Sequence, residues 1–183
     1  MCDPTVRKFE LADQSEVASL YRSGMNGYQA YPITGQCYAW FVNDKLKPEG
    51  DMSNIQSVFM SNAEEKKSCF WVAVDEGKIV GCVGAVPTTK YTDDHIELVR
   101  MFVSPECRKK TIGYKLVETL EVWARDAGFK KIYLSTLADL VEPNHFYPKC
   151  GFVLTEEEEF DVSGNLNLPP PAIVLGNHYV KTL

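Results

Sequence analysis

A cluster of cationic side chains lies in residues 104–116, SPECRKKTIGYKL, although the 183-residue chain has a net charge of −6. Its cationic residues are Arg108, Lys109, Lys110 and Lys115. The stretch follows an apolar run and precedes one with helical spacing. The first N–H groups of a helix lack internal partners and carry partial positive charge, so this junction favours a phosphate-bearing ligand. Gly113 would let the ligand approach the backbone closely. A solvated, charged turn is the alternative.

Two common phosphate-binding motifs do not fit this stretch. A P-loop needs Gly-x-x-x-x-Gly-Lys-Ser/Thr, which is missing here. A dinucleotide-binding fingerprint needs three glycines that open a helix after the first strand, whereas Gly81 and Gly84 lie inside an apolar strand-like run. Other residues are therefore needed to indicate which class of phosphate ligand binds here.

Composition indicates a soluble globular chain, with 45% hydrophobic and 24% charged residues. We expect one domain over residues 1–183. A sequence pI near 5.1 argues against nucleic acid as the main partner, because such binding depends on Lys and Arg. No secretory signal and no apolar run of membrane-spanning length is present, so no membrane association is expected. Without a Cys-x-x-Cys pair and with three histidines, we expect no metal site, reduced thiols and a cytoplasmic location.

Hydrophobic periodicity predicts alternating strands and helices. A capping-box pattern of Asp13 and Glu16 marks the first helix, and Gly128 ends the helix after the cationic stretch. On that second helix Lys115, Glu118, Glu121 and Arg125 fall on the face opposite the apolar residues. Strands are predicted at 5–11, 69–74, 79–86, 95–103, 130–137, 152–160 and 177–183, and helices at 12–25, 35–46, 51–60, 112–127 and 144–152. This order predicts an α/β fold (an α+β sandwich), a mixed, mostly antiparallel central sheet flanked by helices.

Two motifs in order resemble those of the GCN5-related N-acetyltransferase (GNAT) family. The family signature Arg/Gln-x-x-Gly-x-Gly/Ala is similar to residues 108–113, RKKTIG, and the second element is Tyr147 followed by Gly151-Phe152. The hairpin SCFWVAVDEGKIVGCVGAVP, residues 68–87, is similar to the camello-like branch, which includes the cysteine-conjugate acetyltransferases. The resemblance covers roughly residues 65–160 and implies a GNAT fold with acetyl-CoA as cosubstrate.

The chain departs from the family at two places. Thr111 stands where the signature has glycine, and a β-branched residue is costly there if the position needs a positive φ; its hydroxyl could instead contact a phosphate. Residues 27–60 lack the long hydrophobic insertion of the camello-like relatives. This departure from the relatives implies a location in solution and leaves the substrate open.

The resemblance implies roles for particular residues. The acetyl-CoA site comprises Met101, Phe102, Val103, Arg108, Lys109, Lys110, Thr111, Ile112, Gly113 and Tyr114. Backbone N–H groups of 101–103 would face the thioester oxygen, where negative charge develops. Tyr147 is the expected acid for the leaving thiolate, with a packing tyrosine as the alternative. Glu97 is the candidate base for the amine, with an exposed strand charge as the alternative, and His95 shares its face.

The expected reaction is direct acetyl transfer to a primary amine of a small molecule in a ternary complex. A CoA-binding module with little catalysis and a protein or peptide N-acetyltransferase are the alternatives. The acceptor pocket is expected from residues 27–60, the 87–95 loop and the loop before the last strand, with an aromatic cluster of Tyr28, Tyr31, Tyr38, Trp40 and Phe41. The run TEEEEF, 155–160, is interpreted as a solvated strand end. Whether the chain forms a homodimer is left open.

Overall fold

The computed structural model describes residues 4–24, 32–61, 67–107 and 111–183. They contain a seven-stranded sheet with the order β1-β2-β3-β4-β5-β7-β6. The strands are β1 (Thr5–Lys8), β2 (Cys69–Asp75), β3 (Lys78–Pro87), β4 (His95–Val103), β5 (Lys131–Leu137), β6 (Val153–Asp161) and β7 (Ile173–Thr182). Every neighbouring pair is antiparallel except the parallel pair β4–β5. The predicted mixed, mostly antiparallel sheet is confirmed.

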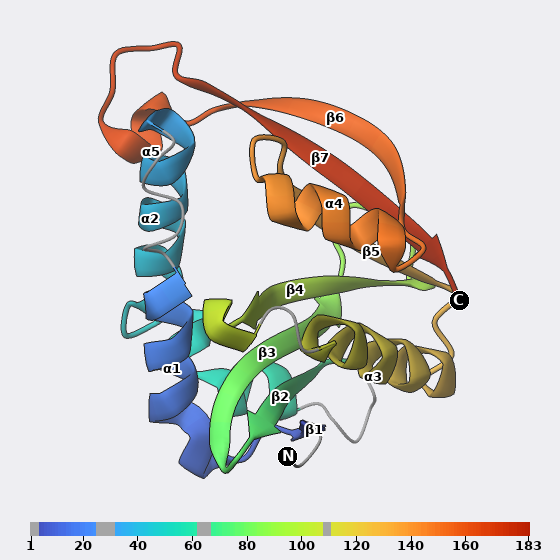
Figure 1. The fold of residues 1–183 in the computed structure, drawn as a ribbon. Helices are drawn as coiled ribbons and strands as arrows, with labels where there is room; N and C mark the ends of the chain where they lie inside the picture. Colours follow the sequence, from blue (N-terminus) through green and yellow to red (C-terminus); the bar gives the residue numbers. More distant parts are fainter. Residues whose placement is uncertain (1–3, 25–31, 62–66, 108–110) are drawn as a thin grey trace.

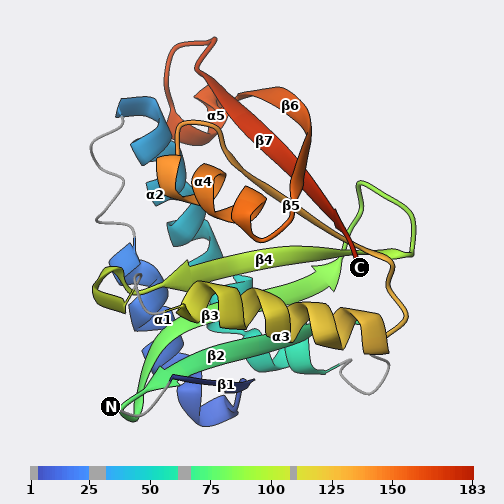
Figure 2. The same cartoon turned by 45° about the vertical axis from the view of Figure 1, so that its right-hand side comes forward.

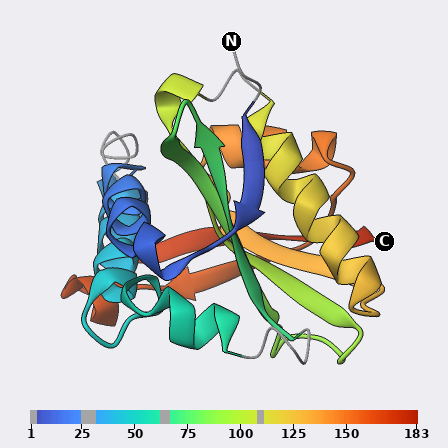
Figure 3. The same cartoon turned by 90° about the horizontal axis from the view of Figure 1, so that it is seen from below.

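Helices cover both faces of the sheet. They are α1 (Gln14–Ser23), α2 (Pro32–Leu46), α3 (Ile112–Asp126), α4 (Val141–Lys149) and α5 (Ser163–Leu166). Figure 1 and Figure 3 show α1 and α2 on one face, and α3 on the other. The predicted α+β sandwich is therefore confirmed.

Two hydrophobic clusters fill the two faces. One joins Ile112, Leu116 and Leu120 of α3 to buried residues of β2–β5 and to Tyr147 of α4. The other joins Val17 of α1 and Val42 of α2 to the opposite face of β2 and β3. Both faces of the β2–β3 hairpin are thus buried, which explains its continuous apolar sequence.

The first helix begins after Asp13, as predicted, but its capping box differs from the prediction. Asp13 is its N-cap residue but makes no side-chain cap bond, and the capping box pairs Glu10 with Asp13. Asp13 also forms a bidentate pair with Arg7, at 2.6 and 2.8 Å, which lowers the pKa of this carboxyl group. Glu16, the predicted partner, accepts the N–H of Ile79 at 2.8 Å. The first strand consequently ends at Lys8, before the predicted boundary.

Three other predictions need correction. Residues 51–60 form a 3₁₀ turn, Asp51–Ser53, and a π-helical turn, Gln56–Met60, in place of one helix. The last strand begins at Ile173, before the predicted start at 177. Glu121 of α3, placed on the exposed face by its spacing, is 9% exposed and pairs with Lys181 of β7.

Strands β4 and β5 separate along their length, and this separation creates the space for a site. They pair only at His95↔Lys131, Ile96↔Ile132 and Glu97↔Tyr133. Figure 2 shows them close together at one end and apart at the other, where α4 begins. Beyond Glu97, β4 contains a bulge: Gly84↔Val99 is followed by Cys82↔Phe102, so β4 has an extra residue. Arg100 in this bulge has a φ of 54°.

Candidate active site

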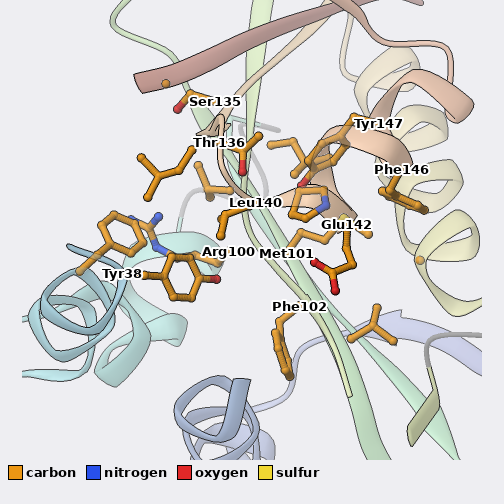
Figure 4. Close-up of a pocket in the computed structure, with 18 of the residues that line it drawn as sticks. Tyr38, Arg100, Met101, Phe102, Ser135, Thr136, Leu140, Glu142, Phe146 and Tyr147 are labelled. Atoms are coloured by element: carbon orange, nitrogen blue, oxygen red, sulfur yellow. The ribbon is translucent and has the colours of Figure 1, made fainter. Parts of the chain in front are cut away.

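A cavity of about 900 Å³ lies between the separated strands. Its walls come from residues 97–103 of β4, residues 135–137 of β5, the first turn of α3, most of α4, and α2. Figure 4 shows side chains of these elements converging on it, including Met101, Tyr147 and Glu142. The cavity is large enough for a small-molecule ligand. Its lining brings together most of the described residues that the sequence assigned to catalysis and cofactor binding.

The α3 end of the cavity has the geometry of an anion site. Thr111 is the N-cap of the 15-residue helix α3 and makes no side-chain cap bond. The first N–H groups of this helix have no partners within the helix, which favours a phosphate there. Thr111 and Gly113 both line the cavity. Arg108, Lys109 and Lys110, which the sequence also assigned to this site, lie outside the described residues.

Thr111 stands where the family signature has glycine, and its backbone is left-handed. Its φ is 54° and its ψ is 0°, in the left-handed region. A β-branched residue pays about 1–2 kcal/mol or more there. This position therefore does require a positive φ, as considered from the sequence. The end of α3 that faces the cavity begins with a strained residue.

Gly113 is small for a reason that the sequence did not indicate. A Cβ added to it would lie 3.0 Å from Phe146 Cζ and 3.5 Å from Met101 Cε. The residue thus makes room for an aromatic ring of α4, which neighbours Tyr147, as well as lining the cavity. Tyr114 and Phe146 pack with ring centroids 5.2 Å apart beside it.

The β4 residues expected at the thioester line the cavity as one segment. Met101, Phe102 and Val103 lie beyond the last β4–β5 pair. Phe102 and Val103 still pair with β3, whereas the side toward β5 faces the cavity. This strand edge is therefore the position at which backbone donors can meet a ligand carbonyl. Ile112, assigned with them, is 1% exposed and packs in the core.

Tyr147 lies on α4 and is held by aromatic contacts. It is 9% exposed. Its ring lies 5.7 Å from Phe152 and 6.1 Å from Tyr179, measured between centroids. Figure 4 shows its hydroxyl directed toward the cavity. The packing and the acid interpretations are therefore compatible, since the ring packs while the hydroxyl lines the cavity.

Glu97 lies where β4 and β5 stop pairing. It is half-buried and lines the cavity, so it is not the exposed strand charge of the alternative interpretation. Burial raises the pKa of its carboxyl group, and the nearby positive charge of Arg100 opposes this effect. A carboxyl group with a raised pKa in a cavity is suited to accept a proton near neutral pH.

Other candidate groups have less direct positions. His95 is buried, stacks on Tyr91 at 4.9 Å and bonds Asp94 at 2.8 Å, and it does not line the cavity. His145 lines the cavity on the exposed side of α4. Burial raises the pKa of Cys150 to about 11, which makes it a poor nucleophile.

The end of the cavity near α2 carries the aromatic and cationic residues. Tyr38 and Phe41 line it, with ring centroids 6.5 Å apart. The Arg100 guanidinium lies 5.0 Å from the Phe41 ring and donates to Asp51 from Nε at 3.0 Å and Nη2 at 2.7 Å. Trp40 is 38% exposed and is not a lining residue. Tyr28 and Tyr31 lie outside the described residues.

Sequence reasoning did not identify several lining residues. Ser135, Thr136 and Glu142 line the cavity from β5 and α4, and Figure 4 shows the Glu142 carboxylate directed inward. Arg100 was also missed, although a single charge inside the apolar run LVRMFV, residues 98–103, was a usable signal. Glu142 had no such signal, because it precedes the recognisable tyrosine motif by several residues.

The acidic run forms part of β6 and has a cationic partner. Lys90 contacts Glu156 at 2.9 Å and Glu158 at 3.0 Å. Glu157 and Glu159 are exposed. The loop between β3 and β4 is thereby linked to β6, next to the lining residues Val86 and Phe160. In the described part of the chain, no group of His, Cys, Asp and Glu residues is arranged to hold a metal ion.

Comparison with known structures identifies the fold. The chain superposes on the PaiA N-acetyltransferase of Thermoplasma acidophilum, solved in complex with coenzyme A, with a TM-score of 0.75 at 16% identity over 100% of both chains. It also superposes on a GNAT-family acetyltransferase of Staphylococcus aureus, with a TM-score of 0.69 at 20% identity, over 98% of this chain and 99% of the other.

Sequence relatives agree with the structural ones. Human N-acetyltransferase 8 is 36% identical over 118 residues, 63% of this chain and 51% of that protein. The probable N-acetyltransferase camello of Xenopus tropicalis is 37% identical over 102 residues, 56% of this chain and 45% of that protein. The matched part of this chain thus spans about half the length of these relatives. The uncharacterized N-acetyltransferase YjgM of Escherichia coli is 28% identical over 149 residues, 81% of each chain.

None of the helices in residues 4–24, 32–61, 67–107 and 111–183 combines the length and apolar character needed to span a bilayer. The profile of the Acetyltransferase (GNAT) family matches residues 29–152, which include β4, the cationic stretch, α3 and the Tyr147 motif. With separated β4 and β5 strands, a bulged β4 and a helix N-terminus at one cavity, the chain belongs to the Acetyltransferase (GNAT) family.

Proposed function

We propose that the protein is an acetyl-CoA-dependent N-acetyltransferase that acts on a primary amine of a small molecule through a ternary complex. The observation that carries this proposal is the cavity between β4 and β5, which Glu97 and Tyr147 both line. One seven-stranded sheet runs from β1 to β7, which supports treating residues 1–183 as one domain. The five described cysteines are free thiols, which supports the proposed cytoplasmic location.

The residues at the α3 end fit coenzyme A. Bound acetyl-CoA would supply a thioester whose acyl group is transferable. The first N–H groups of α3, after Thr111, would bind its diphosphate. Arg108, Lys109 and Lys110 of the signature directly precede Thr111 in the sequence and would add positive charge. Ile112, Gly113 and Tyr114 complete that turn, and the edge of 101–103 would direct backbone groups to the acyl end.

The catalytic side chains have complementary roles in this proposal. Glu97, with its raised pKa, takes a proton from the acceptor ammonium, directly or through water. The neutral amine then attacks, and backbone N–H groups of β4 stabilise the negative charge on the carbonyl oxygen. As the C–S bond breaks, Tyr147 donates its hydroxyl proton to the departing sulfur, and the second proton that the acceptor nitrogen loses restores the hydroxyl. Both groups line one cavity, so no covalent acetyl-enzyme is needed.

One observation favours a second candidate, a CoA-binding module with little catalysis. Thr111 holds a left-handed conformation at the phosphate end, which strains the position that should approach the diphosphate. Such strain could weaken cofactor binding and with it turnover.

A thiol-release assay separates these candidates. The protein is given acetyl-CoA and a panel of free amines, amino acids and peptides, after calorimetry with acetyl-CoA. Release on free amines that falls about 10²–10⁴-fold in Tyr147→Phe supports the proposal. Binding without release on any amine supports the module, and release on peptides alone supports a protein acetyltransferase. Full turnover by Tyr147→Phe would remove Tyr147 as the acid.

A further inference from the structure

Asn144 occupies a junction of three elements close to Tyr147. It lies in the first half of α4, after the turn 137–140 that connects β5 to the helix. Its side-chain amide makes five hydrogen bonds. The mechanism described above does not use this residue, and it does not line the cavity.

The Asn144 amide nitrogen fixes the turn that ends β5. Nδ2 donates to the carbonyl oxygens of Leu137 at 2.9 Å, Ala138 at 3.1 Å and Leu140 at 2.7 Å. Leu140 is the N-cap of α4 and has no side-chain oxygen with which to cap the helix. The N-cap residue of α4 thus makes no side-chain hydrogen bond, and the Asn144 amide supplies hydrogen-bond donors to this turn instead.

The Asn144 amide oxygen fixes the same turn to β7. Oδ1 accepts Nδ2 of Asn177 at 2.8 Å and the hydroxyl of Tyr179 at 2.9 Å. The amide orientation is determined by these partners, because backbone carbonyls can only accept and the Tyr179 hydroxyl has to donate. Asn177 and Tyr179 are 8% and 3% exposed, so the junction is shielded from water.

This junction is connected to Tyr147 in two ways. Tyr147 follows Asn144 by three residues, which places the two side chains on one face of α4. The Tyr179 ring, whose hydroxyl bonds Asn144, also packs against the Tyr147 ring at 6.1 Å. Asn144 therefore holds both the helix that carries Tyr147 and one of the rings that support it.

We propose that Asn144 is a positioning residue that holds the Tyr147 hydroxyl at the leaving sulfur. This inference rests on the proposed function. Losing the amide would remove the side-chain donor from the Ala138 carbonyl and the acceptor from two buried donors, Asn177 Nδ2 and the Tyr179 hydroxyl. The Leu137 and Leu140 carbonyls would keep only their backbone donors, and α4 would shift relative to β5. A displacement of about 1 Å at a reacting group can cost about 10²-fold in rate.

A double-mutant cycle tests the proposal. We expect Asn144→Ala to lower kcat between about 10- and 100-fold, with a smaller change in the KM for acetyl-CoA. In a Tyr147→Phe background, we expect the same change to lower kcat less than twofold, because the hydroxyl that it positions is already missing. An equal loss in both backgrounds would overturn the proposal, as would an unchanged kcat in a protein that melts at a lower temperature.

A matched control and a milder variant distinguish a positioning effect from a general loss of stability. Asn54→Ala removes an amide that bonds two carbonyls, Pro48 O at 2.6 Å and Gly50 O at 2.9 Å, away from the cavity. It should lower the melting temperature and leave kcat unchanged. Tyr179→Phe removes one of the five bonds and keeps the ring, and should give a partial loss of kcat that also disappears with Tyr147→Phe.

A crystal structure gives a readout that does not depend on turnover. In Asn144→Ala bound to CoA, the Tyr147 hydroxyl should lie about 1 Å or more from its wild-type position. An unmoved hydroxyl would overturn the positioning role even if no acceptor amine were found. Failure of the wild-type protein to acetylate any amine would instead count against the proposed function.

Discussion

Glu97 and Tyr133 form the last residue pair that joins β4 to β5 before the two strands separate. The side chain of Glu97 therefore stands at the closed end of the cavity, where it is half-buried. The negative charge of Glu97 in turn contributes to raising the pKa of Tyr133, behind desolvation. A residue at this point can meet an acceptor that enters from the α2 side while the cosubstrate occupies the open end.

Glu97→Gln should abolish the proton acceptor and keep the shape of the cavity. We expect kcat/KM of the wild type to rise with pH through the raised pKa of Glu97, above the ordinary glutamate value. In Glu97→Gln this limb should disappear and kcat/KM should fall about 10²–10⁴-fold. Rate profiles from pH 5 to 9 measure this, and Glu118→Gln, on the exposed side of α3, is the control. An unchanged profile would rule out Glu97 as the base.

Glu97→Gln, which should lower activity, should raise the stability of the fold at neutral pH. A carboxyl group whose pKa is raised by folding favours the folded state below its unfolded pKa, and this advantage is lost as pH rises through the folded pKa. We therefore expect Glu97→Gln to raise the melting temperature at neutral pH and to have little effect near pH 4. A destabilised Glu97→Gln protein at pH 7 would contradict the desolvation of this carboxyl group.

Thr111 offers a test of strain at the phosphate end. Its φ of 54° is tolerated better by asparagine and best by glycine. We expect Thr111→Asn and Thr111→Gly to bind acetyl-CoA more tightly, and Thr111→Gly to gain up to about 1 kcal/mol of stability after the entropy of the unfolded chain is subtracted. Calorimetry and thermal melts measure both effects. Weaker binding by both variants would show that the threonine hydroxyl contacts the ligand.

Asp51 should control the acceptor end of the cavity through Arg100. The two bonds from Nε and Nη2, at 3.0 and 2.7 Å, hold a guanidinium that also contacts Phe41. Asp51→Asn should raise the KM for the acceptor amine and leave the KM for acetyl-CoA unchanged. The reason is that Arg100, packed on Phe41, lines the end of the cavity near α2, away from the N-terminus of α3. Steady-state kinetics with each substrate varied in turn measure this. An equal change in both KM values would indicate a general loss of structure.

Regular elements were predictable because their signals are local. The β2–β3 hairpin has two apolar runs around a short turn, and α3 shows apolar residues at helical spacing. The N-cap position of Asp13 was predicted correctly, but its capping box with Glu16 was wrong, because the Asp13 carboxylate binds Arg7 and the N–H of Glu10. The predicted exposure of Glu121 was wrong because its partner, Lys181, lies 60 residues away on the last strand.

The candidate site was predictable where the family motifs are continuous. Tyr147, Gly113 and the residues before them belong to two short motifs. The bulge at Arg100 and the junction at Asn144 depend on pairing between distant segments, such as Asn144 with Asn177. No local pattern records such contacts, so the residues that shape and support the cavity became visible only in three dimensions.

His178 should make stability depend on pH below neutrality. It is 3% exposed, and its Nδ1 lies 2.6 Å from the Tyr133 hydroxyl, whose proton it can accept in the tautomer protonated at Nε2. Desolvation, together with the positive charge of Lys90, lowers its pKa, while Glu158 and Glu156 of β6 oppose this effect.

Because the folded state resists protonation of His178, its contribution to stability is present above the unfolded pKa of about 6.5 and is lost as pH falls below that value. We expect the wild-type melting temperature to fall between pH 7 and pH 5, and His178→Asn to show a smaller fall. Lys90→Met should also reduce the pH dependence, because it removes the positive charge nearest the ring. Equal pH dependence in all three proteins would show that His178 does not titrate in this range, and that the β5–β7 ladder beside the cavity is insensitive to its charge.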